Sequence, residues 1–497
     1  MIKIKLLDEN CIYECEKGMV LYDVLSTYGV IDAPCGGSGI CGKCRVMVDG
    51  ESVLSCLYTV TKDITVQKPQ KTPIGEIVSN GYCKEFAADV FDDNIFGVAI
   101  DIGTTTVVAT LVKLSTGSEI SNLSCLNSQK AYGQDVITRI HHSNEKPNGL
   151  KILQEAIVGD ISRLLLELCY YNNVKQEQIV RVAISGNTTM IHMLLGIDPI
   201  GIARAPYEPA FSGAVKQNAH KFGLPVAEEC IMYCLPAISS FIGGDITAGI
   251  LSCNLERLRE KVLFIDIGTN GEIVLSNNGK ICCCSCAAGP ALEGMNISCG
   301  MRAAHGAIED VHIQGESVTY TTIGNAPAKG ICGSGLLAVV AEMCRVGILH
   351  STGRLMPHPL VQKVGDKKCF VLDRERKIYV TQKDIRQVQL AKGAILSGVN
   401  TVLESAQLLP EKIDRVMVAG QFGAHLKAES IVGAGLLPSV WISKITYVGN
   451  TSKIGAYICL MSEHECATAE SAISAVTYIE LSTLEGYEDC FIKSLGF

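Results

Sequence analysis

The stretch FGVAIDIGTTTVVATLV at residues 96–112 consists of two apolar runs joined by the polar turn DIGTT, which begins at Asp101. Residues 262–275, VLFIDIGTNGEIVL, repeat this arrangement around the turn DIGTN. Because short apolar runs bounded by turn residues are typical of buried strands, each stretch predicts a strand, a tight turn and a second strand. Two copies predict an internal duplication of a βββαβα half, set in α/β layers that begin at Ile95.

The duplicated turn has the composition of a phosphate-binding loop. Its glycine permits a tight turn, and the following backbone N–H groups and hydroxyls can bind phosphate oxygens. The aspartate would repel phosphate, so we expect it to hold Mg²⁺ or the water shell of Mg²⁺. One copy alone would be explained equally well as an ordinary hairpin turn, but two copies predict a clamp for a triphosphate. The candidate residues are Asp101, Gly103, Thr104, Thr105 and Thr106 in the first loop and Asp266, Gly268, Thr269, Asn270 and Gly271 in the second.

A second candidate site lies near the N-terminus, in the glycine-rich stretch APCGGSGICGKCRVMVDGESVLSC at residues 33–56. Three thiolates from one loop and a fourth from a nearby strand can bind a [2Fe–2S] cluster. Zinc is the alternative, but zinc ribbons usually have two C-x2-C pairs and this stretch has one. The spacing resembles that of ferredoxin-like modules fused to larger redox enzymes. The expected ligands are Cys35, Cys41, Cys44 and Cys56.

The texture of the sequence predicts three regions. Residues 1–67 read as a strand, a helix, the cysteine loop and further short strands, which is a β-grasp pattern and the expected [2Fe–2S] domain. Residues 68–95 contain Pro69 and Pro73, show no clear period and are predicted to be a linker. Residues 96–497 are predicted to form a two-lobed α/β part, with lobes of about 96–260 and 261–497.

Composition restricts the class of protein. The chain has 497 residues, of which 47% are hydrophobic and 19% charged, so we expect several domains with large cores and little disorder. A net charge of −8 without a basic stripe argues against nucleic acid as a partner. No apolar run has the length of a membrane span, and the first residues lack an apolar signal core. The 23 cysteines, an odd number, favour a reducing cytoplasm over a disulfide framework, and they suggest an anaerobic host.

The doubled aspartate turn resembles the superfamily of acetate and sugar kinases, actin and the heat-shock ATPases. The resemblance implies a glycine turn at the adenosine, for which Gly420, Gln421 and Gly423 in RVMVAGQFGAHL are candidates, although Gln421 and Phe422 depart from the compact glycine pair. Gly333 and Gly335 in GICGSGL are further candidates. It also implies an acidic residue that positions the attacking water. Asp245 in SSFIGGDITAGIL is the first candidate, and a helix-terminal carboxylate is an equal alternative; Glu272 is weaker, because an exposed strand position explains it. The expected catalytic set is Asp245, Asp101, Asp266 and Glu272.

A ferredoxin-like module ahead of this ATPase fold is similar to the reductive activators of corrinoid proteins. The resemblance rests on AIDIGTTTVVATLV, LNSQKAYGQDVITRI, SGNTTMIHMLLGIDP, CAAGPALEGMNISCGMRAAHGAI, GICGSGL and VAGQFGAHL. It implies that ATP, with Mg²⁺, drives one electron from the cluster to an inactive Co(II) corrinoid protein of a methyltransferase system. It further implies an external low-potential electron donor and a homodimer. One departure is that only the 68–95 linker stands where members of the family can carry a middle domain.

Three other functions remain open from the sequence. The chain could drive electrons into another low-potential enzyme, as the activators of radical dehydratases do, although those hold a [4Fe–4S] cluster on the ATPase domain. It could be a small-molecule kinase with an appended redox module, or a non-enzymatic electron carrier. The run ICCCSCAAG with Cys282, Cys283, Cys284 and Cys286 favours buried strand thiols over a second metal site, because successive strand residues point to opposite faces. The segment SGNTTM at 185–190 reads equally as a cleft loop or as a helix cap.

Overall fold

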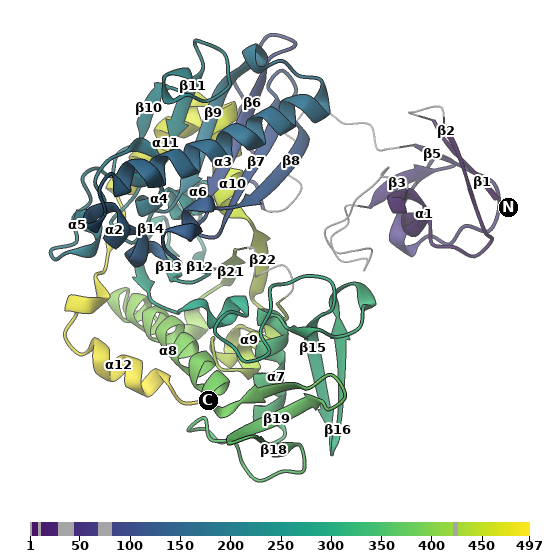
Figure 1. Ribbon diagram of the computed structural model, residues 1–497, viewed down its shortest axis with the longest axis vertical. Helices are drawn as coiled ribbons and strands as arrows, with labels where there is room; N and C mark the ends of the chain where they lie inside the picture. Colours follow the sequence, from purple (N-terminus) through teal and green to yellow (C-terminus); the bar gives the residue numbers. More distant parts are fainter. Residues whose placement is uncertain (1, 8–10, 28–43, 68–81, 421–425) are drawn as a thin grey trace. The chain divides into compact units, whose positions relative to one another are not determined.

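The computed structural model describes residues 2–7, 11–27, 44–67, 82–420 and 426–497. The expected ligands Cys35 and Cys41 and the candidate residues Gln421 and Gly423 lie outside these ranges. Backbone contacts divide the chain into two units, Met1–Asn80 and Gly81–Phe497, each of which is described by itself (Figure 1). None of the helices in the described ranges is both long and apolar enough to cross a lipid bilayer.

The first unit contains a five-stranded sheet in the order β2-β1-β5-β3-β4. β1 pairs antiparallel with β2 and parallel with β5, and β3 pairs antiparallel with both β4 and β5. This is a β-grasp order, as the sequence predicted. The elements are β1 (Ile2–Leu6), β2 (Cys11–Cys15), α1 (Leu21–Thr27), β3 (Arg45–Val48), β4 (Glu51–Leu54) and β5 (Ile64–Gln67).

The core of the first unit forms between α1 and one face of this sheet. In β1 the side chains of Ile2, Ile4 and Leu6 are buried while the intervening lysines are exposed, which is the period-two pattern of a half-buried strand. Val24 and Leu25 of α1 join the same cluster, so the helix presents its apolar stripe to the sheet.

The first lobe of the second unit is built on a six-stranded sheet in the order β10-β11-β9-β6-β7-β8. β6, β7 and β8 are antiparallel neighbours, and β9 and β11 run parallel to β6. The helix α3 packs on β7 and β8. The strands are β6 (Phe96–Ile102), β7 (Thr106–Lys113), β8 (Ser118–Leu126), β9 (Ile179–Gly186), β10 (Val215–Asn218) and β11 (Ile231–Cys234), and the helices are α2 (Val136–Glu145), α3 (Gly149–Asn172), α4 (Thr188–Leu195) and α5 (Ile200–Ala203).

The second lobe repeats this sheet. Its order is β22-β21-β12-β13-β14-β23, with β12, β13 and β14 antiparallel and with β21 and β22 parallel to β12. Each sheet therefore contains five strands in the same order, 3-2-1-4-5 counted along its own lobe, which confirms the predicted duplication. The strands are β12 (Lys261–Ile267), β13 (Gly271–Asn277), β14 (Lys280–Cys286), β21 (Arg415–Ala419), β22 (Ile445–Gly449) and β23 (Thr477–Tyr478).

Two helices lie between the two large sheets. α6 (Gly244–Ser252) packs on α10 (Thr451–Met461), and α10 also packs on β6 and β9 of the first lobe. On its other side α6 shares a buried cluster with strands of the second lobe, in which Ile246 and Ile250 meet Phe264. Both lobes therefore contact the same pair of helices, and the first residues of α6 and α10 lie close to the ends of the central strands.

Most of the remaining elements of the second lobe extend it away from this central pair, whereas α11 (Glu463–Ser474) packs on α6 and α10 (Figure 1). α8 covers the face of the sheet formed by β13 and β14, and α12 packs on α8. Two small sheets follow, in the orders β16-β15-β17 and β18-β19-β20. The bounds are β15 (Ala307–Gln314), β16 (Ser317–Thr322), β17 (Gly330–Ile331), α7 (Gly333–Arg345), β18 (Val361–Val364), β19 (Lys367–Asp373), β20 (Ile378–Thr381), α8 (Gln382–Ser405), α9 (Ala428–Gly433), α11 (Glu463–Ser474) and α12 (Tyr487–Ser494).

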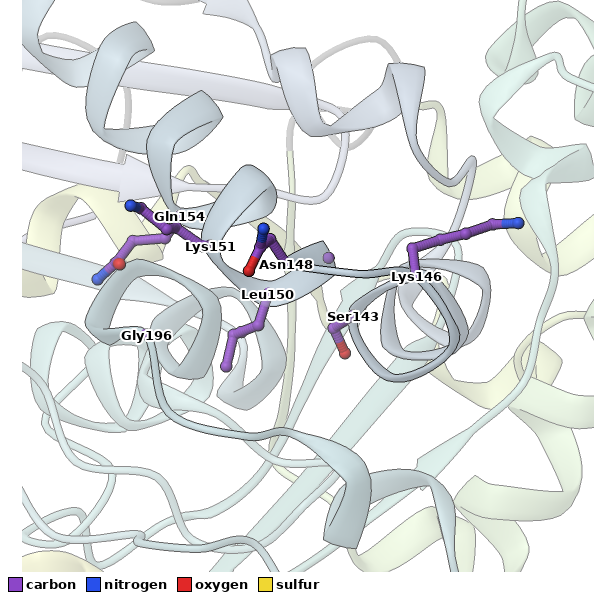
Figure 2. Close-up of a pocket in the computed structure, with 8 residues that line it drawn as sticks. Ser143, Lys146, Asn148, Leu150, Lys151, Gln154 and Gly196 are labelled. Atoms are coloured by element: carbon purple, nitrogen blue, oxygen red, sulfur yellow. The ribbon is translucent and has the colours of Figure 1, made fainter.

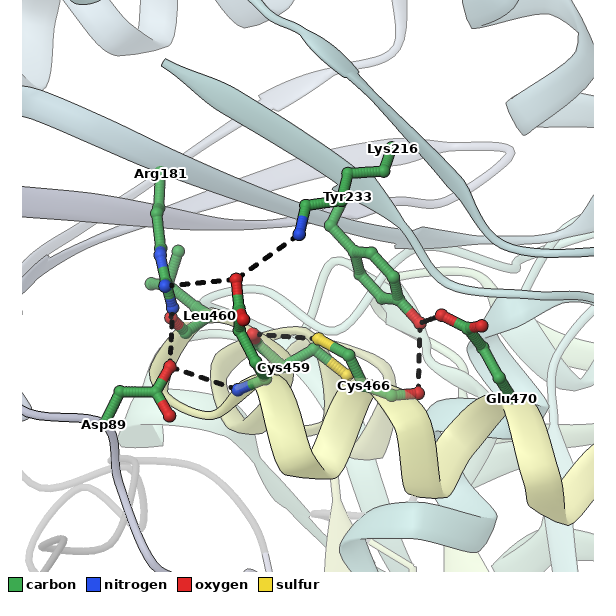
Figure 3. A network of polar contacts seen from close by, with 9 residues as sticks. Asp89, Arg181, Lys216, Tyr233, Cys459, Leu460, Cys466 and Glu470 are labelled. Atoms are coloured by element: carbon green, nitrogen blue, oxygen red, sulfur yellow. Dashed lines mark hydrogen bonds and ion pairs between the residues drawn. The ribbon is translucent and has the colours of Figure 1, made fainter. Parts of the chain in front are cut away.

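Residues 82–95, in the region that the sequence assigns to a linker, have no helix or strand but lie along the second unit. The Lys84 ammonium is buried and pairs with Glu465 of α11 at 2.7 Å, while its backbone N–H donates to the Ser252 carbonyl of α6. Asp89 accepts from Arg181 of β9 at 2.9 Å (Figure 3). This segment is therefore fastened to the strand β9 and to the helices α6 and α11.

Close packing explains why position 335 in GICGSGL is a glycine, and this contact leads to a prediction about stability. A Cβ added to Gly335 in α7 would lie 2.0 Å from the Ile308 carbonyl oxygen of β15. We expect Gly335→Ala to lower the free energy of unfolding by roughly 1–3 kcal/mol, because the helix would have to move off the strand. Thermal unfolding measures this. The matched control is Gly159→Ala in α3, where a Cβ meets nothing within 4 Å and should stabilise by roughly 0.5–1 kcal/mol; equal melting temperatures for the two variants would contradict the close contact.

Candidate functional site

The first aspartate loop is the turn between β6 and β7, as predicted. Asp101 lies in β6, Gly103 to Thr105 form the turn, and Thr106 begins β7. The Gly103 N–H donates to the Thr106 carbonyl at 2.9 Å, and a Cβ on Gly103 would lie 2.8 Å from that oxygen. Glycine is therefore required by the closeness of the turn itself.

Three polar side chains hold this turn, of which that of Asn187 is half-buried and the other two are fully buried, and the sequence did not identify them as site residues. The Asn127 amide donates to the Gly103 carbonyl at 2.9 Å, and the Asn187 amide donates to the Thr104 hydroxyl at 3.1 Å. The fully buried Arg139 of α2 donates to the Thr104 carbonyl at 2.6 Å. Burial lowers the pKa of Arg139 to about 10, so the guanidinium is still charged at neutral pH beside the loop. The only sequence signal was that these residues lie in the strings LNSQKAYGQDVITRI and SGNTTM.

The second loop, between β12 and β13, is held differently. The Gly268 N–H donates to the Asn270 carbonyl at 2.9 Å, and the Thr269 carbonyl accepts from the N–H of Gly289 at 2.7 Å. The Thr269 hydroxyl donates to Glu293 at 2.6 Å, so Glu293 is a further residue that the sequence did not identify. A Cβ on Gly268 would approach nothing closer than 3.7 Å, whereas one on Gly271 would meet Cys286 Sγ at 2.8 Å. Packing therefore explains Gly271, and among the residues that the structure describes no close contact explains Gly268.

The Asp101 carboxylate is held by side chains from a distant part of the sequence. It is 9% exposed, and each of its oxygens accepts one hydrogen bond from the β22–α10 junction. Asn450 Nδ2 donates to Oδ2 at 2.8 Å, and Ser452 Oγ donates to Oδ1 at 2.6 Å. These partners are more than 300 residues away in sequence. Neither was predicted, because nothing local in the sequence reveals which helix end returns to the first loop.

The structure brings the predicted carboxylates together. Burial, and then the negative charge of Asp101, raises the pKa of Asp245 to about 7. Burial, and then the charges of Asp245 and Asp101, raises the pKa of Asp266 to about 7 as well. Burial and the charges of Asp245 and Asp266 hold the pKa of Glu272 well above its usual value. Burial is the largest cause of each of these pKa shifts, and the added effect of neighbouring charges indicates that these groups share one poorly solvated region.

The pKa of Asp101 is also raised by burial, but its hydrogen bonds act in the opposite direction. Burial raises its pKa, whereas the bonds from Ser452 and Asn450 and the charge of Lys453 lower it. Glu272 is half-buried in β13, opposite Asp266, rather than an exposed strand residue. The two loops therefore meet at one acidic site, which would be neutralised by a cation.

Asp245 has the helix-terminal position of one alternative that the sequence left open, and the positioning of water by Asp245 stays a prediction. It lies in the first turn of α6, where its Oδ1 accepts from the Ile246 N–H at 2.9 Å, and its charge also acts on Asp266. The preceding Gly243 is needed because a Cβ there would lie 2.5 Å from the Asn187 Cα. The pair Gly243-Gly244 thus lets the start of α6 approach the segment that holds the first loop.

The segment SGNTTM fulfils both of its interpretations. Asn187 caps α4, because its side-chain oxygen accepts from the Met190 N–H at 3.0 Å. Its amide nitrogen also reaches the first loop at Thr104. The helix cap is thus part of the site.

The candidates for adenosine contact are only partly described. Gly420 follows β21 with φ +98°, and a Cβ on it would lie 2.7 Å from Asp266 Oδ1, so this glycine borders the second loop. Gly333 and Gly335 lie in the first turn of α7. The N-cap residue of this helix is Cys332, whose backbone is extended. Their packing against β15 accounts for Gly335, and a contact with a nucleotide remains a prediction.

In the first unit, the two described cysteines of the predicted cluster site come together. Cys44 Sγ and Cys56 Sγ are 3.0 Å apart, and the Ser55 N–H donates to the Cys44 carbonyl at 2.9 Å. Both thiols are buried beside Tyr22. Burial alone would raise the pKa of Cys44, but hydrogen bonds with Cys56 and Ser55 lower it below the ordinary thiol value. Two convergent thiols, one of them favouring the thiolate, fit a metal-ligating role.

The cysteine run of β14 is buried on two faces, as the strand period predicted. Cys282, Cys284 and Cys286 face α8, and Cys284 Sγ donates to the Gly398 carbonyl at 3.6 Å. Cys283 belongs to the cluster on the opposite face. Within the described ranges no group of three His, Cys, Asp or Glu side chains is arranged to hold a metal ion directly.

A cavity of about 410 Å³ lies away from the aspartate loops, between α2, α3 and the end of α4 (Figure 2). It is lined by residues that include Lys146, Asn148 and Gln154. None of its lining residues belongs to the two loops, so the hollow is not the candidate nucleotide site.

The fold and the acidic double loop define a nucleotide-binding protein of the actin and sugar-kinase class. The family model described as the "C-terminal domain of RACo the ASKHA domain" matches residues 260–497, and the model "RACo middle region" matches residues 96–258. The chain belongs to this family of reductive activators of corrinoid proteins. The second match also corrects our expectation of a missing middle domain, because the region that the family calls its middle is the first lobe described above.

Three relatives support this assignment. The chain is 32% identical to the corrinoid activation enzyme RamQ of Eubacterium limosum, over 81% of this chain and 70% of that protein. It is 24% identical to the [Co(II) methylated amine-specific corrinoid protein] reductase of Methanosarcina barkeri, over 81% and 77%. A solved structure of a reductive activator for corrinoid, iron-sulfur protein matches with a TM-score of 0.75 and 31% identity, covering 100% of this chain and 98% of that one.

Proposed function

We propose that this chain uses ATP to return a Co(II) corrinoid protein of a methyltransferase system to Co(I), donating one electron from an N-terminal [2Fe–2S] cluster. The observation that carries the proposal is the convergence of two aspartate loops on one buried acidic site, in a chain of the corrinoid-activator family. The alternatives predict other acceptors, which the experiment below includes.

The acidic site supports binding of ATP with Mg²⁺. Burial raises the pKa of all three aspartates, the charge of Asp101 further raises that of Asp245, and the charges of both raise that of Asp266, so a divalent cation would relieve the repulsion. Since no three of the described acidic, cysteine or histidine side chains form a direct metal cage, the carboxylates would engage Mg²⁺ largely through water. The metal would neutralise phosphate charge. Thr104 to Thr106 and Thr269 would bind phosphate oxygens, and Asp245 would position the attacking water.

The first unit supports binding of the cluster. Cys44 and Cys56 would supply two of its four thiolates, and Cys35 and Cys41 the other two. The apolar neighbours of Cys44 and Cys56 would keep bulk water from this side of the site. The cluster would supply one electron per transfer. An external low-potential donor would reload it, and we propose a homodimer in the cytoplasm as the working form.

ATP is needed because the electron moves uphill. Each 100 mV of unfavourable potential opposes transfer of one electron by about 2.3 kcal/mol. The pair α6 and α10 touches both lobes and carries Asp245 and Ser452, so occupation of the acidic site would act on the packing of the lobes. We propose that the ATP-bound form binds the Co(II) protein and that hydrolysis releases it.

Anaerobic titration tests the proposal. The purified chain, reduced by a chemical donor, is mixed with candidate Co(II) corrinoid proteins with and without Mg–ATP, and cobalt absorbance is followed. We expect Co(I) to form at least tenfold faster with ATP. Acetate, glycerol and sugars are screened as phosphate acceptors, and a dehydratase as an electron acceptor. Equal Co(I) yields with and without ATP, or phosphoryl transfer to one of these acceptors, would overturn the proposal.

A further inference from the structure

The sequence pattern Gly-Asn-Thr followed by Thr or Ser occurs twice at the junction of a strand and a helix. Residues 186–189 join β9 to α4, and residues 449–452 join β22 to α10. In both copies the asparagine caps the helix, since Asn187 Oδ1 accepts from the Met190 N–H at 3.0 Å and Asn450 Oδ1 from the Lys453 N–H at 2.9 Å. Capping uses only the side-chain oxygen, which leaves each amide nitrogen for a second partner.

Both amide nitrogens reach the same loop. Asn187 donates to the Thr104 hydroxyl at 3.1 Å, and Asn450 donates to Asp101 Oδ2 at 2.8 Å. Ser452, in the first turn of α10, donates to the other Asp101 oxygen at 2.6 Å and lies 2.9 Å from the Ser185 hydroxyl. The 449–452 segment thus fixes both oxygens of one carboxylate, although helix capping needs neither of these contacts.

The hydrogen bonds from Asn450 and Ser452 to Asp101, which we call the brace, distinguish this carboxylate from the others of the site. Within the described ranges, side-chain donors reach Asp101, whereas Asp245 accepts from the backbone N–H of Ile246. A carboxylate that accepts a side-chain hydrogen bond on each oxygen is held in one orientation. The segment also borders the second loop, because the Gly420 N–H donates to the Gly449 carbonyl at 3.1 Å and Gly420 adjoins Asp266.

We propose that Asn450 and Ser452 are positioning residues for ATP hydrolysis, which hold the Asp101 carboxylate in one orientation at the first phosphate loop. The inference rests on the proposed function, because it assigns a role within the same nucleotide site. Asn187 acts in parallel on the Thr104 hydroxyl. The brace works through Asp101 and does not itself contact the nucleotide.

Two substitutions separate positioning from helix capping. Asn450→Asp keeps the cap, since aspartate is as good an N-cap as asparagine, but it replaces the donor to Asp101 by a second carboxylate. Ser452→Ala removes the other donor and leaves the cap untouched, and Ser452→Thr restores a hydroxyl. In the full chain we expect kcat for ATP hydrolysis to fall at least tenfold in Asn450→Asp and Ser452→Ala. We expect the Mg²⁺ concentration for half-maximal rate to rise at least threefold, and Ser452→Thr to recover most of both losses.

The matched control is Ser397→Ala in α8, a buried helical serine whose hydroxyl donates to the Ala394 carbonyl at 3.0 Å, far from the loops in sequence. It should leave both parameters within twofold. Melting temperatures are measured for all variants, and activity is assayed below the lowest of them; if Asn450→Asp does not fold, the Ser452 pair decides.

The outcomes are separable. If the unsubstituted chain hydrolyses ATP, and folded Asn450→Asp and Ser452→Ala keep its kcat and Mg²⁺ requirement within twofold, the brace is overturned while the ATPase proposal stands. If only melting temperatures change, Asn450 and Ser452 are structural and the inference is also overturned. If the unsubstituted chain neither hydrolyses ATP nor is stabilised against heat by Mg–ATP, the proposed function and the inference fall together.

Discussion

Substitution of Cys56 by alanine is expected to abolish reduction of the Co(II) protein while leaving ATP hydrolysis within twofold. Cys56 Sγ lies 3.0 Å from Cys44 Sγ, so the substitution removes one proposed ligand and one of the contacts that lower the pKa of Cys44. A cluster with three thiolates would be lost or unstable, and the rate of Co(I) formation should fall at least 100-fold. The aspartate loops belong to the other unit of the chain, which is why hydrolysis should persist.

The measurement needs readouts other than activity. Iron content, visible absorbance and EPR of the reduced, anaerobically purified chain report the cluster directly. Cys15→Ala is the matched control, because Cys15 is also buried in the first unit, with its pKa raised by burial, but lies in β2 within the core beside α1. It should retain iron. Full iron content in Cys56→Ala, or equal loss in both variants, would contradict the assignment of Cys56 as a ligand.

Local patterns were enough to predict the architecture. The apolar runs around Asp101 and Asp266 are continuous because the central strands are buried on both faces. Both copies of the duplicated half show this pattern. The alternation in β1 was likewise readable. What local pattern did not predict is the position of residues 82–95: a segment without period looks like a linker, yet Lys84 is buried by pairing with Glu465, far along the chain.

The candidate site likewise contains residues that the sequence predicted and residues that it did not. Residues that are proposed to bind phosphate within their own loop, such as Thr104 and Thr269, carry a local signal, and so do the cysteines. Residues that support the loops from elsewhere, such as Arg139, Glu293 and Ser452, depend on which strand ends meet, and that is set by the tertiary fold. Asp245 lies between these cases, because its helix was predictable but its closeness to Asp266 was not.

Asp245→Asn is expected to lower kcat for ATP hydrolysis by 10²–10⁴-fold, roughly the contribution of a group that orients or deprotonates an attacking nucleophile. Asparagine keeps the size of the side chain and can still accept from the Ile246 N–H, so the fold should be retained. Mg–ATP binding should be weakened less than turnover. Asp366→Asn, in an exposed turn of the second lobe, is the control and should be unchanged. Turnover within threefold of the unsubstituted rate would exclude Asp245 from water positioning.

The same substitution should stabilise the nucleotide-free protein above neutral pH. The pKa of Asp245 is raised from 3.8 to about 7 on folding, so between these values the folded chain binds more protons than the unfolded chain, and stability falls as pH rises. The cost of burying the charged carboxylate, to which the charge of Asp101 adds, is fully present above pH 7 and absent below about pH 4. At about 1.4 kcal/mol per pKa unit, its removal is worth at most roughly 4 kcal/mol. Melting curves of Asp245→Asn at pH 8 should therefore lie above those of the unsubstituted chain, and the difference should shrink toward pH 5; a constant or reversed difference would show that folding does not raise the pKa of Asp245.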